Sequence, residues 1–236
     1  MDSAAPSLLV VTGLQREARI AAGHGVVTLC SGGDPQLLRE RLDSFFSAQT
    51  GRRAIRGILS FGLAGGLAQH LRSGDLIVST SVEAAGNRHD AHPGWHDAVI
   101  SALGKRRAVH RGATAGHDLV LAKASEKTSL NRQTGALAVD MESHIAAHYA
   151  RRHDLPFAAV RAISDPATRN LPPIAMDALT PDGKIAIGKV LMDILRETDQ
   201  LPALITAGID SERAFAALRR CRRLLGPLFG LGGAHL

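Results

Sequence analysis

Short apolar runs alternate along this chain with stretches of helical periodicity. The apolar runs predict short strands, and the periodic stretches place charged residues on one side of each predicted helix. Strands are expected at 8–12 (LLVVT), 26–30 (VVTLC), 57–61 (GILSF), 75–82 (DLIVSTSV), 136–139 and 157–163 (FAAVRAI). Helices are expected at 36–47, 142–152 and 184–197. This alternation predicts an α/β fold in which helices cover both faces of a mainly parallel sheet.

The composition fits one folded domain over residues 1–199, followed by a basic helical extension over 200–236. Of the 236 residues, 45% are hydrophobic and 21% are charged, which supplies a full core and argues against disorder. The net charge of +6 is compatible with anionic partners, but only 3% of residues are aromatic, too few to favour nucleic-acid binding by base stacking.

The cysteines and the N-terminus bear on the cellular compartment. Cys30 and Cys221 form neither a metal-binding spacing nor a disulfide framework. The N-terminus lacks the pattern of a signal peptide, and no apolar run reaches the ~20 residues of a membrane span. We therefore expect a cytoplasmic protein.

Polar or glycine-rich segments follow several predicted strands. In parallel sheets, ligands bind beyond the carboxyl ends of the strands. The segments are Gly13–Glu17, Gly62–Leu67, Asp140–Ser143 and Ser164–Pro166. The small residues of Gly62–Leu67 would let backbone N–H groups approach a ligand, although a plain tight turn explains them equally well.

Asp165 is the first candidate for catalysis. It follows the apolar strand 157–163, and Pro166 favours an extended backbone before it. A carboxyl group in a partly dry pocket can have a raised pKa and donate a proton to a leaving group, such as N7 of a purine. Arg161, four residues earlier, would share a strand face with Asp165 and could orient it. Alternatively, Asp165 caps a following helix.

Two glutamates could complete such a site. Glu142, at a predicted helix start, could accept hydrogen bonds from the two hydroxyls of a ribose, or it could merely favour the helix N-terminus. Glu17 could hold or deprotonate an attacking water. Its alternative is a solvent-facing helix residue paired with Arg16 or Arg19. A non-catalytic nucleotide-binding module would not need all three carboxylates.

Three strings resemble the nucleoside phosphorylase and nucleosidase superfamily. SFGLAGGL (60–67), AVDMES (138–143) and VRAISD (160–165) occur in the family's order, and the likeness spans roughly residues 8–198. It is closest to the methylthioadenosine/S-adenosylhomocysteine nucleosidases. The resemblance implies a three-layer α/β/α sandwich with a twisted, partly barrel-like mixed sheet. It also implies a homodimer or larger homo-oligomer that acts on a small-molecule nucleoside, with no cofactor and no nucleic-acid partner.

The resemblance assigns roles to named residues. Met141 would pack on the ribose and Glu142 would bind its diol. Ser164 and Arg161 would position Asp165, whose carboxyl group would bond to N7 and the 6-amino group of adenine. The remaining substrate-binding positions that it implies are Leu63, Ala64, Gly65, Leu119 and Val120.

The resemblance also favours hydrolysis. Glu17, in TGLQREA (12–18), falls where the nucleosidases have their water-activating glutamate and where bacterial purine nucleoside phosphorylases have a phosphate-binding arginine. Arg16 and Arg19 lie nearby, so phosphorolysis, with phosphate as co-substrate, is the alternative.

The opening TGLQREARI (12–20), together with SFGLAGGL and the long tail, is most similar to the hopanoid-associated branch of the family. That branch is linked to the release of adenine from adenosylhopane, which leaves ribosylhopane. The chain departs from the nucleosidases at Leu63, where they usually have a small polar residue. It departs again at Gly116–Val120, which lacks their usual Phe.

Histidines and the apolar segment 169–176 carry weaker signals. His89, His92 and His96 cluster in the sequence, and His144 and His148 are four residues apart, but no third ligand is evident for a metal. In the resemblance, His89 and Asp90 lie near the ribose or a subunit interface. Residues 169–176 (RNLPPIAM) form either a lid over the 5′ side of the nucleoside or a plain loop.

The tail combines an apolar face with a basic one. The apolar face holds Ala214, Ala217, Leu218, Cys221, Leu224 and Leu225, and the basic face holds Arg219, Arg220, Arg222 and Arg223. Such a helix can lie on an anionic membrane, here through residues 211–231 at the inner face. Alternatively, it docks on its own domain or on a partner subunit.

Overall fold

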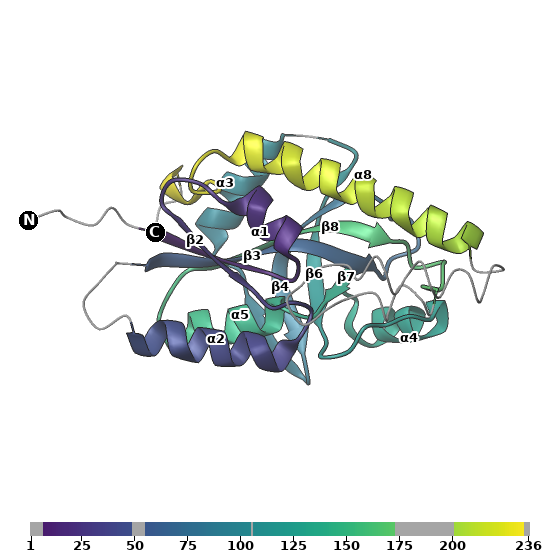
Figure 1. The fold of residues 1–236 in the computed structure, drawn as a ribbon, viewed down its shortest axis with the longest axis horizontal. Coiled ribbons are helices and arrows are strands. Elements are labelled where there is room, and N and C mark those ends of the chain that lie inside the picture. Colours follow the sequence, from purple (N-terminus) through teal and green to yellow (C-terminus); the bar gives the residue numbers. More distant parts are fainter. Residues whose placement is uncertain (1–6, 49–54, 105, 173–200, 234–236) are drawn as a thin grey trace, which may run out of the picture.

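The structure is a computed structural model that describes residues 7–48, 55–104, 106–172 and 201–233. The predicted helix 184–197 and the second half of segment 169–176 lie outside the described residues. Figure 1 shows a central sheet with helices on both sides, as the sequence predicts. The predicted α/β fold with a mixed, partly barrel-like sheet is confirmed.

The sheet begins with a parallel part and becomes mixed. Strand β1 (Ser7–Thr12) pairs in parallel with β2 (Val26–Cys30) and with β3 (Ile55–Gly66). Strand β8 (Phe157–Asp165) also runs parallel to β3. Strand β7 (Ala138–Asp140) pairs antiparallel with β3 and parallel with β6 (Val109–Gly116). Strand β4 (Leu76–Ala84) pairs with β6, β8 and the edge strand β5 (Asn87–Asp90).

These pairings close part of the sheet into a barrel. Going round it, β3 pairs with β7, β7 with β6, β6 with β4, β4 with β8, and β8 again with β3. The closed part removes two sheet edges that would otherwise need cover. It also brings the ends of β3, β7 and β8 to one place.

Helices pack against both faces of the sheet. Helices α2 (Pro35–Ala48) and α5 (Ser143–Arg152) lie together on one side (Figure 1). Helices α1 (Gln15–Ala21), α3 (Pro93–Leu103) and α8 (Leu201–Leu225) lie on the other side. Helix α4 (Ala124–Thr134) lies near the free ends of β7 and β8, and a short turn of 3₁₀ helix (Leu231–Gly233) follows α8.

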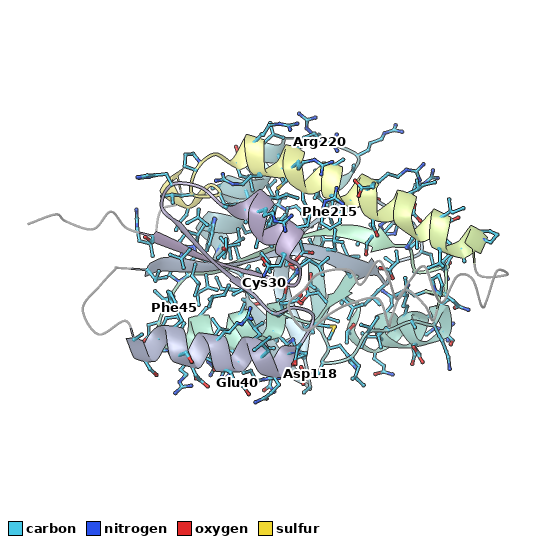
Figure 2. All side chains as sticks on the ribbon, viewed as in Figure 1. Cys30, Glu40, Phe45, Asp118, Phe215 and Arg220 are labelled. Atoms are coloured by element: carbon cyan, nitrogen blue, oxygen red, sulfur yellow. The ribbon has the colours of Figure 1, made fainter. Side chains whose placement is uncertain are left out.

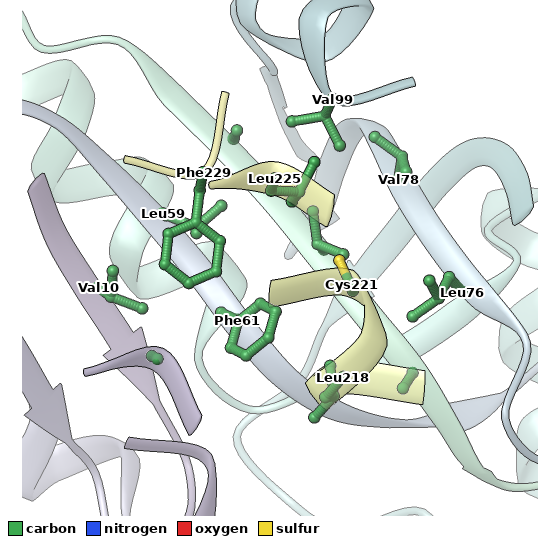
Figure 3. Packing of buried hydrophobic residues seen from close by; sticks show 14 of the residues in the cluster. Val10, Leu59, Phe61, Leu76, Val78, Val99, Leu218, Cys221, Leu225 and Phe229 are labelled. Atoms are coloured by element: carbon green, nitrogen blue, oxygen red, sulfur yellow. The ribbon is translucent and has the colours of Figure 1, made fainter. Parts of the chain in front are cut away.

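Helix α8 is part of the main core rather than an appended segment. Five of the six residues of its apolar face are buried against the sheet and α3, while Leu224 is 40% exposed, and Figure 3 shows Leu218, Cys221 and Leu225 packed beside Phe61, Val78 and Val99. Phe229, just after the helix, packs edge-on against Phe61, and its carbonyl accepts a hydrogen bond from the Trp95 indole. Docking on its own domain, one of the two readings of the sequence, is therefore confirmed.

The buried part of the apolar side of α8 is covered by the protein's own sheet, so it is not free to enter a lipid surface, whereas Leu224 is 40% exposed. The basic side does face outward: Arg219, Arg220 and Arg223 are exposed, and Figure 2 shows Arg220 pointing away from the sheet. Among the described residues, no helix is long and apolar enough to cross a membrane.

Several predicted boundaries differ from the structure. The glycine-rich segment 62–67 was expected to follow its strand, but β3 continues through it to Gly66. The segments of α1, α3, α4, β5 and β6 were not predicted as elements. The predicted mainly parallel sheet is mixed, because β7 and β4 each have an antiparallel partner in the barrel.

Candidate active site

The ends of β1, β3, β7 and β8 bring the predicted catalytic residues to one region. Glu17 lies in the first turn of α1, which directly follows β1. Glu142 lies between β7 and α5, and Asp165 is the last residue of β8. Cys30, labelled in Figure 2, ends β2 at the same edge, and its thiol contacts the Gly13 carbonyl at 3.3 Å.

Glu17 sits in a cradle of backbone N–H groups. Its Oε2 accepts hydrogen bonds from the N–H groups of Gly13 and Leu14, each at 2.8 Å. Its Oε1 accepts one from the N–H of Leu63 at 2.8 Å. The residue is only 2% exposed. The alternative of a solvent-facing glutamate paired with Arg16 or Arg19 is therefore wrong.

Burial gives the Glu17 carboxyl group a pKa suited to acid–base chemistry. Loss of solvation and the nearby negative charge of Glu142 raise the pKa of Glu17 to about 7, although Arg161 and the backbone N–H groups oppose the shift. A group with this pKa exchanges a proton readily at neutral pH.

Two glycines make room for the two glutamates. A Cβ at Gly62 would lie 2.6 Å from Glu17 Oε2, and a Cβ at Gly13 would lie 2.7 Å from Glu142 Oε1. Real Cβ atoms do not come so close to a carboxylate oxygen. Gly13 thus lies between the two carboxylates, since its N–H bonds Glu17 while its Cα faces Glu142.

The Glu142 side chain points into the protein and does not cap the helix that follows it. It precedes α5 but its side chain makes no capping hydrogen bond. Instead Oε1 accepts a hydrogen bond from the Ser31 hydroxyl at 3.0 Å, and Oε2 lies 3.3 Å from Arg161 Nη1. Asp140 caps α5 in its place, accepting hydrogen bonds from the N–H groups of Glu142 at 2.9 Å and Ser143 at 2.6 Å.

Arg161 is a fully buried cation that pairs with carboxylates other than Asp165. Its Nε lies 3.0 Å from Asp140 Oδ2, and the guanidinium also donates to Ser143, Ser60 and the Leu63 carbonyl. The expectation that Arg161 orients Asp165 is therefore wrong. The cause is a bulge: Ile163 pairs with Ala64 and Asp165 with Gly65, so Ser164 is an extra residue that breaks the alternation.

Asp165 is held by Ser164 and by Lys127. The Ser164 hydroxyl donates to Oδ1 at 2.7 Å, as the sequence predicts for a positioning serine, and also reaches the Ala64 carbonyl at 3.3 Å. The Lys127 ammonium group lies 2.6 Å from Oδ2. Burial raises the pKa of Asp165, while the charge and hydrogen bond of Lys127 act in the opposite direction.

Strand β3 sets the spacing between Glu17 and Asp165. The Leu63 N–H bonds Glu17, and Gly65, two residues further on, pairs with Asp165. Two residues of strand span about 7 Å. The two carboxyl groups therefore meet β3 at backbone positions that are two residues apart.

The other predicted pocket residues differ in their burial. Ala64 is buried and Leu63 and Met141 are half-buried. Leu119 is 70% exposed and Val120 is 39% exposed, which makes them two of the most exposed large apolar residues described. Beside Asp165, within the described part of the chain, lies a cavity of about 270 Å³ whose lining includes Leu171, Pro172, Pro202, Ala203 and Ala207.

Residues that the sequence analysis missed hold the site together: Ser31, Ser60, Lys127, Asp140 and Ser143. Asp140 and Ser143 flank Glu142 in the string AVDMES, so the motif itself could have indicated them. Lys127 could not be found in this way, because it lies on a separate helix with no motif of its own.

The histidines do not form a metal site in the described residues, where no cluster of three or more His, Cys, Asp or Glu side chains could hold a metal ion. His144 Nε2 lies 2.9 Å from Asp118, and His92 accepts a hydrogen bond from the Trp95 N–H at the start of α3. These two histidines thus have structural partners.

The arginines beside Glu17 turn away from the site. Arg16 forms a two-point ion pair with Glu212 of α8 and stacks over the Phe215 ring, whose centroid is 4.0 Å from the guanidinium carbon. Arg19 is exposed. Neither of them is placed to hold a phosphate next to Glu17.

The architecture matches solved structures of purine nucleosidases. The futalosine hydrolase of Helicobacter pylori strain 26695 is 13% identical, with 93% of this chain and 97% of that chain covered and a TM-score of 0.68. The 5′-methylthioadenosine/S-adenosylhomocysteine nucleosidase of Neisseria meningitidis, solved with methylthio-immucillin-A, is 15% identical, with 94% and 98% covered and a TM-score of 0.67. The corresponding enzyme of S. pneumoniae is 16% identical, with 95% and 98% covered and a TM-score of 0.66.

At these identities the likeness establishes the fold. A family model supplies the relationship, since the model of the phosphorylase superfamily matches residues 19–191, most of the chain. The chain therefore belongs to the phosphorylase superfamily.

Proposed function

We propose that this protein hydrolyses the N-glycosidic bond of an adenine nucleoside. The observation that carries the proposal is the buried Glu17, a carboxylate with a pKa of about 7 that lies across the strand ends from Asp165. The similar solved structures include a hydrolase and two nucleosidases, in accord with this class of reaction.

In the proposed reaction, Asp165 donates a proton to N7 of the purine as the bond between C1′ and N9 breaks. The bonding electron pair leaves with the base, and positive charge develops on the ribose. Glu17 takes a proton from a water molecule, whose oxygen bonds to C1′. Adenine and a free ribose derivative are the products.

The ribose would be held by Glu142 and Met141. The Glu142 carboxylate has an acceptor position beyond its bonds to Ser31 and Arg161, and a ribose diol presents two donors. The network around Arg161 fixes this carboxylate before substrate arrives. Preorganisation of this kind lowers the cost of ordering the site during the reaction.

Hydrolysis is favoured over phosphorolysis by charge. A phosphate dianion beside Glu17 would meet a buried carboxyl group that is negative for much of the neutral pH range. Arg16 is committed to Glu212, and Arg161 to Asp140 and Glu142. Phosphorolysis would need a cation at this place that is not already paired with a carboxylate.

We infer further that the 5′ substituent is large and apolar, with adenosylhopane as substrate and ribosylhopane as product. The similarity of segment 12–20 to the hopanoid-associated branch supports this choice. Methylthioadenosine and S-adenosylhomocysteine are the alternative substrates.

Any membrane contact would use charge rather than an inserted face. A lipid-linked substrate is met at a membrane surface, and Arg219, Arg220 and Arg223 are exposed on α8. Co-sedimentation of the full chain with anionic vesicles should decrease when these three arginines are changed to Gln. Equal sedimentation of both proteins would argue against this contact.

One experiment tests the reaction and its substrate together. Adenine release is measured for adenosine, methylthioadenosine, S-adenosylhomocysteine and an adenosine with a long apolar 5′ chain. Each substrate is tested with and without phosphate. The Asp165→Asn variant is measured in parallel as the control. Hydrolysis predicts a free ribose product and no phosphate dependence. A ribose 1-phosphate product formed only with phosphate would contradict it, and the preferred nucleoside identifies the 5′ group.

A further inference from the structure

Lys127 is an unusual residue to find in the interior of this protein. It is fully buried, and it is the most deeply buried position of helix α4, which is otherwise polar and largely exposed. Lysines are almost never fully buried unless they are paired. The helix therefore inserts a cation at a position where an apolar side chain would ordinarily serve packing.

The ammonium group of Lys127 has an acceptor for each of its three protons. Asp165 Oδ2 lies at 2.6 Å, the Arg169 carbonyl at 3.2 Å and the Pro166 carbonyl at 3.3 Å. All three acceptors belong to the segment that begins with Asp165. One side chain thus fixes both the carboxylate and the backbone turn that follows it.

Three residues act on the Asp165 carboxylate: Lys127, Ser164 and Arg169. Lys127 on α4 is in direct contact with the carboxylate, and Ser164 on β8 donates to its other oxygen. Arg169 also acts on Asp165 by its charge, but this guanidinium pairs at 2.5 Å with Asp210 of α8, which in turn contacts Arg213. Lys127 is therefore the cation that Asp165 meets at close range.

From this geometry we propose that Lys127 is a positioning residue that sets the proton affinity of Asp165. The inference rests on the proposed function, in which Asp165 must carry a proton and release it to the base. Burial alone would leave Asp165 holding its proton too firmly to be a good donor. The opposite charge at 2.6 Å weakens that hold, and an acid is most effective when its proton affinity matches the working pH.

The test compares pH profiles of kcat/KM for the wild type and Lys127→Met. The acid form of Asp165 is the active one, so activity falls as pH rises through its pKa. Without the neighbouring cation that pKa rises, so the limb of the profile that is set by Asp165 should move to higher pH by about one unit or more, the scale for a close opposite charge. The limb that is set by Glu17 should stay in place and serves as an internal reference.

Two further variants separate charge from structure. Lys127→Gln keeps a hydrogen-bond donor for Asp165 but removes the charge, so it should shift the limb set by Asp165 as Lys127→Met does. It also carries the test if the methionine variant does not fold. Arg169→Met removes a more distant cation of the same segment, and its shift should be clearly smaller.

The outcomes distinguish this inference from the proposed function. A pH profile in which neither limb moves in both folded Lys127 variants, while Asp165→Asn is inactive, would overturn the role of Lys127 alone. Full activity in Asp165→Asn would instead remove the proposed reaction. Adenine binding measured across the same pH range gives a second readout that does not require turnover, and it should show the same displacement.

Discussion

The backbone N–H of Leu63 donates a hydrogen bond to Glu17 Oε1 at 2.8 Å, although the two residues are 46 positions apart. This bond ties the first turn of α1 to strand β3. It fixes a carboxylate that the local sequence alone would leave free on a helix surface. The position of the Glu17 side chain is thus determined by a tertiary contact, and mutation of this residue can test its role.

The raised pKa of Glu17 should make the free energy of unfolding decrease as pH rises. Its pKa is about 7 in the folded protein against an ordinary value of 4.5, so the folded state holds the proton more tightly than the unfolded state. Stability from this group is present below pH 4.5 and is lost as pH rises to about 7. Relative to Glu17→Gln, the wild type should lose about 3 kcal/mol between pH 4 and pH 9.

Denaturant unfolding of the two proteins at several pH values checks this dependence. The same variant should lose at least roughly a hundredfold in kcat/KM, the scale for removing a general base. A stability difference that does not change with pH would contradict the raised pKa of Glu17.

Asp165→Asn should abolish most adenine release. The amide of asparagine cannot give a proton to N7, and loss of a general acid lowers rates by roughly a hundredfold or more. Asn still accepts a hydrogen bond from Ser164, but it leaves the buried Lys127 without its counter-charge, so the variant should also be less stable. Turnover near that of the wild type, measured at a temperature where the variant is folded, would be incompatible with the assigned role.

Arg161→Met should destabilise the protein by about 3–5 kcal/mol, since it leaves Asp140 and Glu142 buried without their cation. Arg152→Met is the matched control. Arg152 pairs with Asp43 at the surface, where both side chains are more than half exposed, and such pairs contribute about 0–1 kcal/mol. Equal unfolding free energies for the two variants would show that the buried network is not holding the site.

Leu218→Ala should cost about 2–5 kcal/mol, because this side chain of α8 is fully buried in the main core. Leu224→Ala, on the same helix but 40% exposed, should change stability by less than about 0.5 kcal/mol. Chemical denaturation measures both. If Leu218 could be truncated without cost, α8 would be a loosely attached tail after all.

Patterns confined to one element were read well from the sequence. The strands at Ser7–Thr12, Val26–Cys30 and Phe157–Asp165 carry mainly apolar runs, and helix α5 carries a clear polar face, so each was expected near its observed place. Segments with mixed or polar composition, such as β5 and α4, gave no periodic signal strong enough to assign.

Pairings between distant elements were harder to predict. The partner of Arg161 depends on a bulge at Ser164 that shifts the alternation of β8, and a single sequence does not mark such an insertion. Lys127 looks like any lysine of a polar helix until α4 is packed against the end of β8. The motifs located the carboxylates, but the tertiary fold determines which cation each one meets.

The cradle around Glu17 has a consequence for attempts to redesign the centre. Its three backbone donors point at one spot whatever side chain occupies it, and Gly62 leaves no slack for a larger group. Placing an arginine at position 17 to recruit phosphate would set a cation against three N–H dipoles. A change of co-substrate would therefore require rebuilding the chain around positions 13, 14 and 63, so the proposed preference for water would depend on the main chain as well as on the side chain.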